Sequence, residues 1–425
     1  MILVSLAPTV NADDGGIVGS TGSIMATLTS EEYEISEVTL AGEEYSDIAM
    51  RGFGSILDPG KPKLPAKTFL VGLPPGAEAT SVTLLSEVQE SVPGTYHIIP
   101  APPLARGDEN PPWEENEEVY SSEGPYPESI FEYVGMGQMR KYSFARVRFC
   151  PIAYYPASGE LVLYKSITVR IAYEIAEELP DELLRDAVMD DVASQTILNY
   201  PSISSQYLPP PGPAPSLAPY DYVIITSDGL VDAVSGLKDW KESIGHSVKV
   251  ATKSWINSNY AGTDIQEKIR NFLIDKYVPW GIKYVLIVGP HSTGSSTTNI
   301  PMRVCSPNPN THTDDTPTDY YYADLTGDWN SDGDGYWGEY GQDNVDFSPE
   351  VYVGRFLTDD SNKVSSICDK TKSFEQTENT GWKKKALLLG AISNYENEAG
   401  GSSHPGYSKT DGATLMEECW SDILS

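Results

Sequence analysis

The stretch PPPGPAPSLAPYDYVIIT, residues 209–226, divides the chain into two parts with different hydrophobic patterns. Six of its first eleven residues are proline, which predicts an extended, semi-rigid linker that cannot pair in a sheet. The apolar run Tyr222–Thr226 at its end is typical of a short buried strand. A chain of 425 residues is long enough for two or three domains, and we place the main boundary at this linker.

The part before the linker predicts an all-β domain, residues 15–176. In Tyr142–Cys150, small and apolar residues alternate with arginines, which predicts a strand with one buried face. Two turn signals, Pro74–Gly76 and Pro156–Gly159, are flanked by runs of the same kind, and we expect a hairpin at each. Several short strands separated by turns favour a β-sandwich. The first turn is flanked by Thr68–Leu73 and Thr80–Leu85. The second follows Tyr142–Cys150 and precedes Leu161–Tyr164 and Ile167–Tyr173.

Residues 177–219 connect this domain to the next. They carry apolar residues at helical spacing and then the proline-rich linker. From residue 220 to residue 425, short apolar strands alternate with amphipathic helices, and a capping box at Thr263 and Gln266 opens one helix. This alternation predicts an α/β domain with a mostly parallel sheet. Its expected strands are 222–226, 247–252, 284–289, 351–354 and 386–389, and its expected helices include 361–374 and 413–424.

The charge of the chain excludes some classes of partner. Asp and Glu number 61 against 29 Lys and Arg, which gives a formal net charge of −32. A field of that sign repels nucleic acid, so we expect no nucleic-acid partner. An acidic excess is typical both of calcium-binding secreted proteins and of salt-adapted proteomes, and composition does not separate the two. No run reaches the roughly 18 apolar residues of a membrane span.

The N-terminus and the cysteines bear on the compartment. Within residues 1–14, the apolar run Ile2–Leu6 precedes Val10-Asn11-Ala12, which has the form of a signal-peptidase site. This pattern predicts the remnant of a signal peptide and an extracellular or cell-surface protein; the alternative is a disordered N-terminus. The cysteines lie too far apart for a CxxC site, so they form disulfides in one of three connectivities or, as we expect for most, stay buried thiols. They are Cys150, Cys305, Cys368 and Cys419.

The sharpest local pattern is the run Asp328–Glu339. Oxygen donors fall at positions one, three, five, seven and twelve, with Gly333 at position six, which is the spacing of a calcium-binding loop. The predicted ligands are Asp328, Asn330, Asp332, Asp334, Tyr336 and Glu339. The flanking residues read as extended, so we expect a structural Ca²⁺ loop without an EF-hand helix pair. The alternative is a solvated acidic loop.

A second cation site is predicted from the surrounding charge. Between Val304 and Gly354 there are eleven acidic residues and no Lys or Arg, so their mutual repulsion opposes folding unless a cation neutralises it. The candidate ligands of the second site are Asp319, Asp324, Asp343, Asp346 and Glu350.

No catalytic constellation stands out. His291 follows a predicted strand, where open parallel sheets place ligand sites, but a loop histidine more often faces solvent. Cys419 lies beside Trp420 in a predicted helix, where packing is its expected role, and His404 lies in a Gly/Ser-rich loop. Cys305 and His312 are near in sequence, but nothing orients them towards each other. The sequence contains no GxSxG elbow, Walker loop or HExxH helix.

In their order along the chain, several segments resemble the gingipain family of cysteine peptidases. The α/β half matches through Tyr222–Thr226, Gly262–Arg270, Tyr284–Gly289, Thr318–Trp329 and Pro349–Arg355. Upstream, Gly60–Pro65 and Leu73–Ala77 are similar to the β-sandwich propeptide of that family. The resemblance runs from about Glu31 to Leu389.

The resemblance implies a caspase-like α/β catalytic domain behind an inhibitory propeptide, with structural calcium and a protein or peptide substrate. It also implies a Cys–His dyad whose histidine precedes glycine. None of the five histidines here precedes glycine, so we expect the dyad downstream of Ser425, an incomplete peptidase domain, and no catalytic residue in this chain. The alternatives are a non-catalytic calcium-binding surface protein with the same fold and an unrelated hydrolase.

Overall fold

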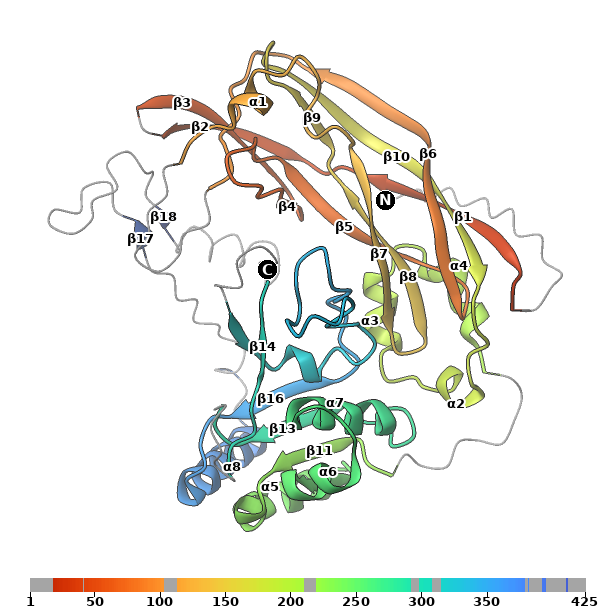
Figure 1. The fold of residues 1–425 in the computed structure, drawn as a ribbon, viewed down its shortest axis with the longest axis vertical. Coiled ribbons are helices and arrows are strands. Elements are labelled where there is room, and N and C mark those ends of the chain that lie inside the picture. The colour runs from red at the N-terminus through yellow and green to blue at the C-terminus, as the bar shows by residue number, and fades with distance from the viewer. Residues whose placement is uncertain are drawn as a thin grey trace, which may run out of the picture.

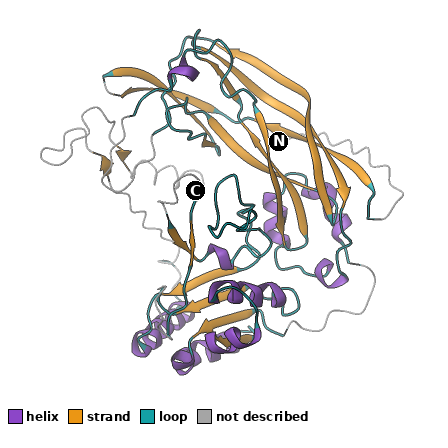
Figure 2. Ribbon diagram, viewed as in Figure 1, coloured by secondary structure: helices purple, strands orange, loops and turns teal. Residues whose placement is uncertain are grey.

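A computed structural model describes residues 18–40, 42–102, 113–209, 219–291, 298–307, 315–378, 381, 392–394 and 410–411. The first part of the chain forms a large β-structure, and the second forms an α/β unit below it (Figures 1 and 2). The expected strand 386–389 and helix 413–424 lie outside the described residues, as do residues 1–14. Within the described residues, no helix is long and apolar enough to span a membrane.

Two antiparallel sheets make up the β-structure. One has the order β1-β10-β6 with β9 on β10, and the other has the order β4-β5-β8-β7. Both sheets contribute buried residues to one hydrophobic core, including Leu28, Val71, Val147 and Val169. The predicted sandwich is therefore present. The strands are β1 (Thr21–Thr29), β4 (Gly54–Ser55), β5 (Pro65–Gly72), β6 (Ala77–Val92), β7 (Phe131–Met139), β8 (Tyr142–Phe149), β9 (Ile152–Tyr155) and β10 (Glu160–Ile175).

The two expected hairpins have different outcomes. A hairpin does close across the Pro156–Gly159 turn, but the partner of β10 is β9, and the expected partner Tyr142–Cys150 forms β8 of the other sheet. β10 continues through register shifts as one strand of 16 residues. The Pro74–Gly76 turn does not close a hairpin, because β5 pairs with β8 whereas β6 pairs with β10. That turn crosses from one sheet to the other. Alternation alone reports a buried face but not which partner the strand takes.

The β-structure also carries a separate hairpin, β2 (Tyr33–Leu40) and β3 (Glu43–Met50), and a short helix, α1 (Glu117–Tyr120). After β10 the chain forms α2 (Asp181–Leu184), α3 (Asp190–Thr196), α4 (Tyr200–Ile203) and η1 (Ser204–Tyr207). Met189, Ala193, Ile197, Ile203 and Tyr207 from this segment pack with residues of β7 and β8 in one buried cluster. The helical segment before the linker is thus part of the sandwich's packing.

The α/β unit is built on a four-stranded parallel sheet of order β12-β11-β13-β16. Its strands are β11 (Tyr222–Thr226), β12 (Val248–Thr252), β13 (Tyr284–Val288) and β16 (Tyr352–Phe356). Successive residues of β11 face opposite layers: Ile224 packs towards α5 and α8, and Val223 and Ile225 pack towards α6 and α7. The helices are η2 (Asp228–Leu230), α5 (Val231–Ser243), α6 (Lys253–Asn259), α7 (Ile265–Lys276) and α8 (Ser361–Gln376).

The predicted start of α7 is one residue off. Asp264, not Thr263, is the N-cap, and its carboxylate accepts a hydrogen bond from the Glu267 amide. Glu267 reaches back to the Thr263 amide and hydroxyl, so the reciprocal cap exists with Glu267 in place of Gln266. Between β13 and β16 lie β14 (Arg303–Cys305), β15 (Thr316–Thr318) and η3 (Tyr320–Tyr322), and β17 (Ile392–Asn394) pairs with β18 (Thr410–Asp411).

Candidate functional site

The carboxyl ends of β11 and β13 meet where the strand order reverses, which is the usual ligand edge of such a sheet. His291 lies just past β13, and its Nδ1 accepts a hydrogen bond from the Met302 amide at 3.0 Å. Asp228, beyond β11, accepts one from the Ser254 hydroxyl at 2.7 Å. These groups hold loops together, and no thiol of the described residues forms a hydrogen bond with His291.

The described cysteines lack the environment of a nucleophile. Burial raises the pKa of Cys150 to about 12 and that of Cys368 to about 11, and it also raises the pKa of Cys305. An active thiol needs a lowered pKa and a base within hydrogen-bond reach. The Sγ atoms of Cys150 and Cys305 instead donate to the backbone carbonyls of Ile152 and Thr316. Cys419, His312 and His404 lie outside the described residues.

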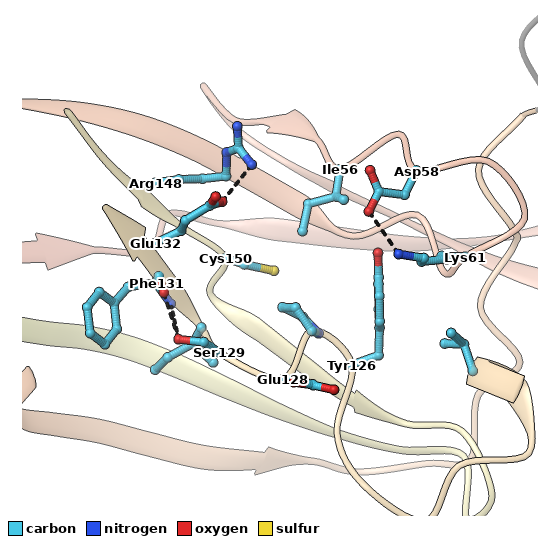
Figure 3. Close-up of a pocket in the computed structure, with 13 residues that line it drawn as sticks. Ile56, Asp58, Lys61, Tyr126, Glu128, Ser129, Phe131, Glu132, Arg148 and Cys150 are labelled. Atoms are coloured by element: carbon cyan, nitrogen blue, oxygen red, sulfur yellow. Dashed lines mark hydrogen bonds and ion pairs between the residues drawn. The ribbon is translucent and has the colours of Figure 1, made fainter. Parts of the chain in front are cut away.

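A cavity of about 320 Å³ in the sandwich has Cys150 in its wall. Figure 3 shows the thiol among Phe131, Tyr126 and the Arg148–Glu132 ion pair. No histidine lines the cavity, so Cys150 has no imidazole base there. The other histidines pair with acids elsewhere: His97 with Glu115 and His246 with Asp221. The described residues therefore contain no Cys–His dyad.

The acidic loop brings three of its six predicted ligands together. Carboxylate oxygens of Asp332, Asp334 and Glu339 lie within 4.8 Å of one another, and they form the one such group of three acids, cysteines or histidines in the described chain. Asp332 and Asp334 are exposed, whereas Glu339 is 2% exposed. Three converging carboxylates, one of them buried, are the donor set that a hard cation prefers.

Four of the predicted ligands also fold the loop backbone by accepting hydrogen bonds from its amides. Asp328, Asp332 and Asp334 each accept a hydrogen bond from the amide two residues later, and Asn330 accepts one from Gly335. Gly333 has a φ of +75°, a left-handed conformation that suits glycine at the sharp turn of such a loop. The spacing of the sequence and the turn geometry of the structure thus agree.

The five residues of the predicted second site are not gathered around one point. Asp319 forms a two-pronged ion pair with Arg355 at 2.6 Å, and Asp343 accepts hydrogen bonds from the Ser331 and Glu339 amides beside the first loop. The remaining three, Asp324, Asp346 and Glu350, are 0%, 5% and 0% exposed. They lie where the sandwich meets the α/β unit.

The tip of the β7–β8 hairpin covers these buried acids. The Gln138 amide donates to Asp346 at 2.7 Å, and the Arg140 amide donates to Glu350 at 3.4 Å. Within the α/β unit, the Leu325 amide and the Thr326 hydroxyl also donate to Glu350. The carboxyls are therefore satisfied partly by the α/β unit and partly by the sandwich.

Arg140 makes the principal contact between the two parts. It is 1% exposed, its Nε donates to the Asp186 carboxylate, and its guanidinium also donates to the carbonyls of Tyr277, Ile282 and Glu350. It also lies over the Tyr277 ring at 5.0 Å. Ile282 and Glu350 lie two residues before the starts of β13 and β16. The sandwich therefore contacts the amino ends of β13 and β16, and His291 lies at the opposite edge of the sheet.

Local sequence patterns do not reveal this interface. Arg146 was expected on the exposed face of its strand, but it is 8% exposed and donates to the Val345 carbonyl and the Asn344 side chain. One signal was available: the two-residue turn Arg140-Lys141 replaces the Asn-Gly type of sequence that such hairpins prefer. Arg140 has a φ of +52°, and a strained arginine is retained where its side chain makes contacts that offset the strain.

The buried acids predict a pH dependence. Burial, reinforced by the Asp324 charge, raises the pKa of Asp346 to about 7, and burial together with the Asp346 charge raises that of Glu350 to about 8. Exposed carboxyls titrate near pH 4, so the folded chain binds more protons than the unfolded chain. This stabilisation is complete below pH 4 and is lost as the pH rises through 7 to 8.

We therefore expect the chain in chelator to unfold at lower denaturant at pH 8.5 than at pH 6. Glu350→Gln should flatten this slope, and Glu132→Gln, which removes an exposed acid paired with Arg148, should leave it unchanged. If the pH dependence is unchanged in Glu350→Gln, the buried acids are not its source. If calcium abolishes the slope in the wild-type chain, the predicted second cation site gains support.

Two family models match successive parts of the chain. A family model described as Propeptide_C25 matches residues 16–207, and one described as Peptidase family C25 matches residues 216–420. One Lys-gingipain from Porphyromonas gingivalis is 21% identical over 393 residues, covering 88% of this chain and 20% of the relative. A second is 23% identical over 170 residues, covering 38% of this chain and 10% of the relative. The chain thus spans about a fifth of the length of the first relative.

Among solved structures, the complex of the pro- and mature domains of RgpB from P. gingivalis is 17% identical with a TM-score of 0.36. It matches over 45% of this chain and 95% of the other. Dimeric latent PorU from P. gingivalis is 14% identical with a TM-score of 0.32, over 89% of this chain and 40% of the other. The propeptide and peptidase matches follow each other and together span most of the sequence, so the chain belongs to peptidase family C25, the gingipain-like cysteine peptidases, and includes its propeptide.

Proposed function

We propose that this chain is the precursor region of a secreted cysteine endopeptidase, with the sandwich as propeptide and the α/β unit as the first part of the peptidase domain. The observation that carries the proposal is the match to the propeptide followed by the match to the peptidase, on either side of the linker. The substrate is a protein or peptide, and the site of action is extracellular or at the cell surface.

The dyad of this peptidase is assigned to residues beyond Ser425. Three thiols lie in the described residues, and burial raises the pKa of each. The three described histidines are bonded to Glu115, Asp221 and the Met302 amide. A family member that hydrolyses peptides needs a thiolate, a base beside it and donors for the developing oxyanion. The described residues form the sheet that would position the thiolate, the base and the oxyanion donors.

A calcium ion is proposed at the loop Asp328–Glu339. Asp332, Asp334 and Glu339 fit the ion because they offer three converging carboxylates, and further oxygens are available from the predicted ligands Asp328, Asn330 and Tyr336. When bound, the ion would offset the repulsion among these acids. Its role would be structural.

Activity measurements test the proposed function. We expect the 425-residue chain to hydrolyse no peptide substrate above background, so alkylation of its cysteines changes nothing measurable. A longer form that extends beyond Ser425, freed of its propeptide, should cleave peptides in a thiol-dependent way. Loss of activity in the longer form upon removal of its downstream cysteine, with Cys305→Ser as the inert control, would identify the nucleophile.

Two outcomes would contradict parts of this proposal. Cleavage by the 425-residue chain that disappears in Cys419→Ala or Cys305→Ala would place the dyad inside this chain. A correctly folded longer form that binds calcium but hydrolyses nothing would support the non-catalytic surface protein instead.

A further inference from the structure

One short stretch of chain, residues 340–346, joins the acidic loop to the surface that the sandwich contacts. This segment follows the loop directly in the sequence. It belongs to residues 323–351, which the structure describes in full and which contain neither a helix nor a strand. Hydrogen bonds to neighbouring parts must therefore hold segment 340–346 in shape, because it has no helix or sheet ladder of its own.

On one side, segment 340–346 is bonded to both ends of the acidic loop. At the start of the loop, the backbones of Asp328 and Asn344 exchange two hydrogen bonds, of 3.2 and 2.9 Å. At its end, the Asp343 carboxylate accepts from the Glu339 amide at 3.0 Å, and the Asp343 amide donates to the Glu339 carbonyl at 3.0 Å. Glu339 is the buried member of the three converging carboxylates, so an ion bound there would fix the point to which the segment is attached.

On the other side, the same segment provides the acceptors for donors from β7 and β8 of the sandwich, beside which it lies (Figure 1). Arg146 donates to the Val345 carbonyl at 3.0 Å and to the Asn344 side chain at 3.1 Å. The two further contacts are those of the Gln138 amide with Asp346, at 2.7 Å, and of Arg148 with the Tyr340 hydroxyl, at 3.2 Å. The shape of the segment therefore decides whether the sandwich finds its acceptors.

The charge of the loop connects the two sides. Without a cation, the carboxylates of Asp332, Asp334 and Glu339 repel one another, which favours loop conformations in which they lie further apart. Because Glu339 is bonded to Asp343, such a movement also displaces the acceptors of Arg146. A buried guanidinium that loses its acceptors is destabilising, so a bound cation and a bound sandwich favour the same conformation.

We propose that segment 340–346 is a recognition surface that the sandwich binds in its cation-bound form, so that calcium and the propeptide bind the α/β unit cooperatively. By thermodynamic linkage, each must then raise the affinity for the other by the same factor. The proposal rests on the calcium ion proposed above at the acidic loop. Its tests measure ion binding and hydrogen exchange, and they need no peptidase activity.

Terbium titrations of the full chain test the coupling from the side of the sandwich. They compare the wild type with Arg146→Ala and with Arg170→Ala, which removes an exposed arginine of β10 and is the matched control for the lost charge. By Coulomb's law alone, loss of a positive charge should tighten the binding of a cation. The coupling predicts the opposite for Arg146→Ala: its terbium dissociation constant should rise at least about fivefold, whereas that of Arg170→Ala should not rise.

Hydrogen exchange in the wild-type chain tests the coupling from the side of the ion, and it needs no variant. In calcium at a hundred times its dissociation constant, the amides of Gln138 and Arg140 should exchange at least about fivefold more slowly than in chelator. These amides donate to Asp346 and Glu350, so their protection reports closure of the sandwich on the α/β unit. The β9–β10 hairpin, which belongs to the other sheet, should exchange at the same rate in both conditions.

Three results would overturn the proposal. If Arg146→Ala folds and binds terbium as tightly as the wild type, the sandwich does not act on the loop. If calcium binds but leaves exchange at the tip of the β7–β8 hairpin unchanged, the loop does not act on the sandwich. A wild-type chain that binds neither terbium nor calcium would remove the ion and the coupling together, whereas the precursor function, which rests on the family matches, would stand.

Discussion

Replacing Arg140 by alanine should destabilise the folded chain by about 3–5 kcal/mol, because it leaves the buried Asp186 carboxylate without its partner. The substitution also removes the donor to the carbonyls of Tyr277, Ile282 and Glu350. Denaturant unfolding followed by tryptophan fluorescence measures the loss. Hydrogen exchange at the tip of the β7–β8 hairpin should show whether the interface opens.

Two other arginine substitutions calibrate this result. Arg148→Ala removes an arginine of β8 whose side chain reaches the α/β unit. Its ion pair with Glu132 and its hydrogen bond to Tyr340 are exposed, so we expect the free energy of unfolding to fall by less than about 1 kcal/mol. The Arg140→Lys variant should remain well below the wild type in stability, since an ammonium group cannot donate to all four acceptors that the planar guanidinium reaches.

A double substitution separates the ion pair from the rest of the contact. Arg140→Ala combined with Asp186→Ala should lower the stability by less than the sum of the single changes. The reason is that Asp186→Ala removes the carboxylate that Arg140→Ala leaves buried without a partner. If Arg140→Ala destabilises the chain no more than Arg148→Ala does, the guanidinium is not the principal contact between the two parts.

Calcium should raise the free energy of unfolding of the α/β unit by about 2.7 kcal/mol when its concentration is a hundred times the dissociation constant. The ion would bind the folded loop, where Asp332, Asp334 and Glu339 converge, and not the unfolded chain. Thermal melts in calcium and in chelator measure this difference. Terbium, excited through the neighbouring aromatic residues Tyr336 and Trp337, offers a direct probe of binding.

Asp332→Asn should shrink the calcium effect and weaken the terbium signal, since it removes one charge from the cluster while keeping its size. Asp239→Asn, on the exposed side of α5, is the matched control and should behave like the wild type. Identical melts in calcium and in chelator would show that the loop holds no ion under these conditions.

Sequence patterns predicted the individual elements better than their partners. The apolar runs at Tyr222–Thr226 and Tyr284–Gly289 contain β11 and β13, because a fully buried strand needs apolar residues on both faces. The Pro74–Gly76 turn was misread as a hairpin because periodicity is a local property, and sheet membership depends on long-range pairing. The acidic loop stands out in the sequence because its candidate ligands and its turn glycine occur at fixed offsets within twelve residues.

The interface could not be predicted in the same way. Arg140, Asp186 and Glu350 are separated by long stretches of chain, and nothing in the local pattern relates one to another. Arg146 follows the alternation of an exposed position, and only a second domain against that face explains its burial. The second group of acids is likewise divided by tertiary structure: Asp319 pairs with Arg355, whereas Asp324, Asp346 and Glu350 lie under the hairpin.

The place that Arg140 occupies has a consequence for how the chain folds. Domains fold largely in the order in which they are synthesised, so the sandwich precedes the parallel sheet. Parallel strands are slow to pair, because long crossovers must close before any contact forms. The guanidinium binds the carbonyls of Tyr277 and Ile282, between α7 and β13, and that of Glu350, before β16, which is 68 residues further along the chain than Ile282. A preformed hairpin tip can thus act as a template that aligns these strands while the remainder of the sheet assembles.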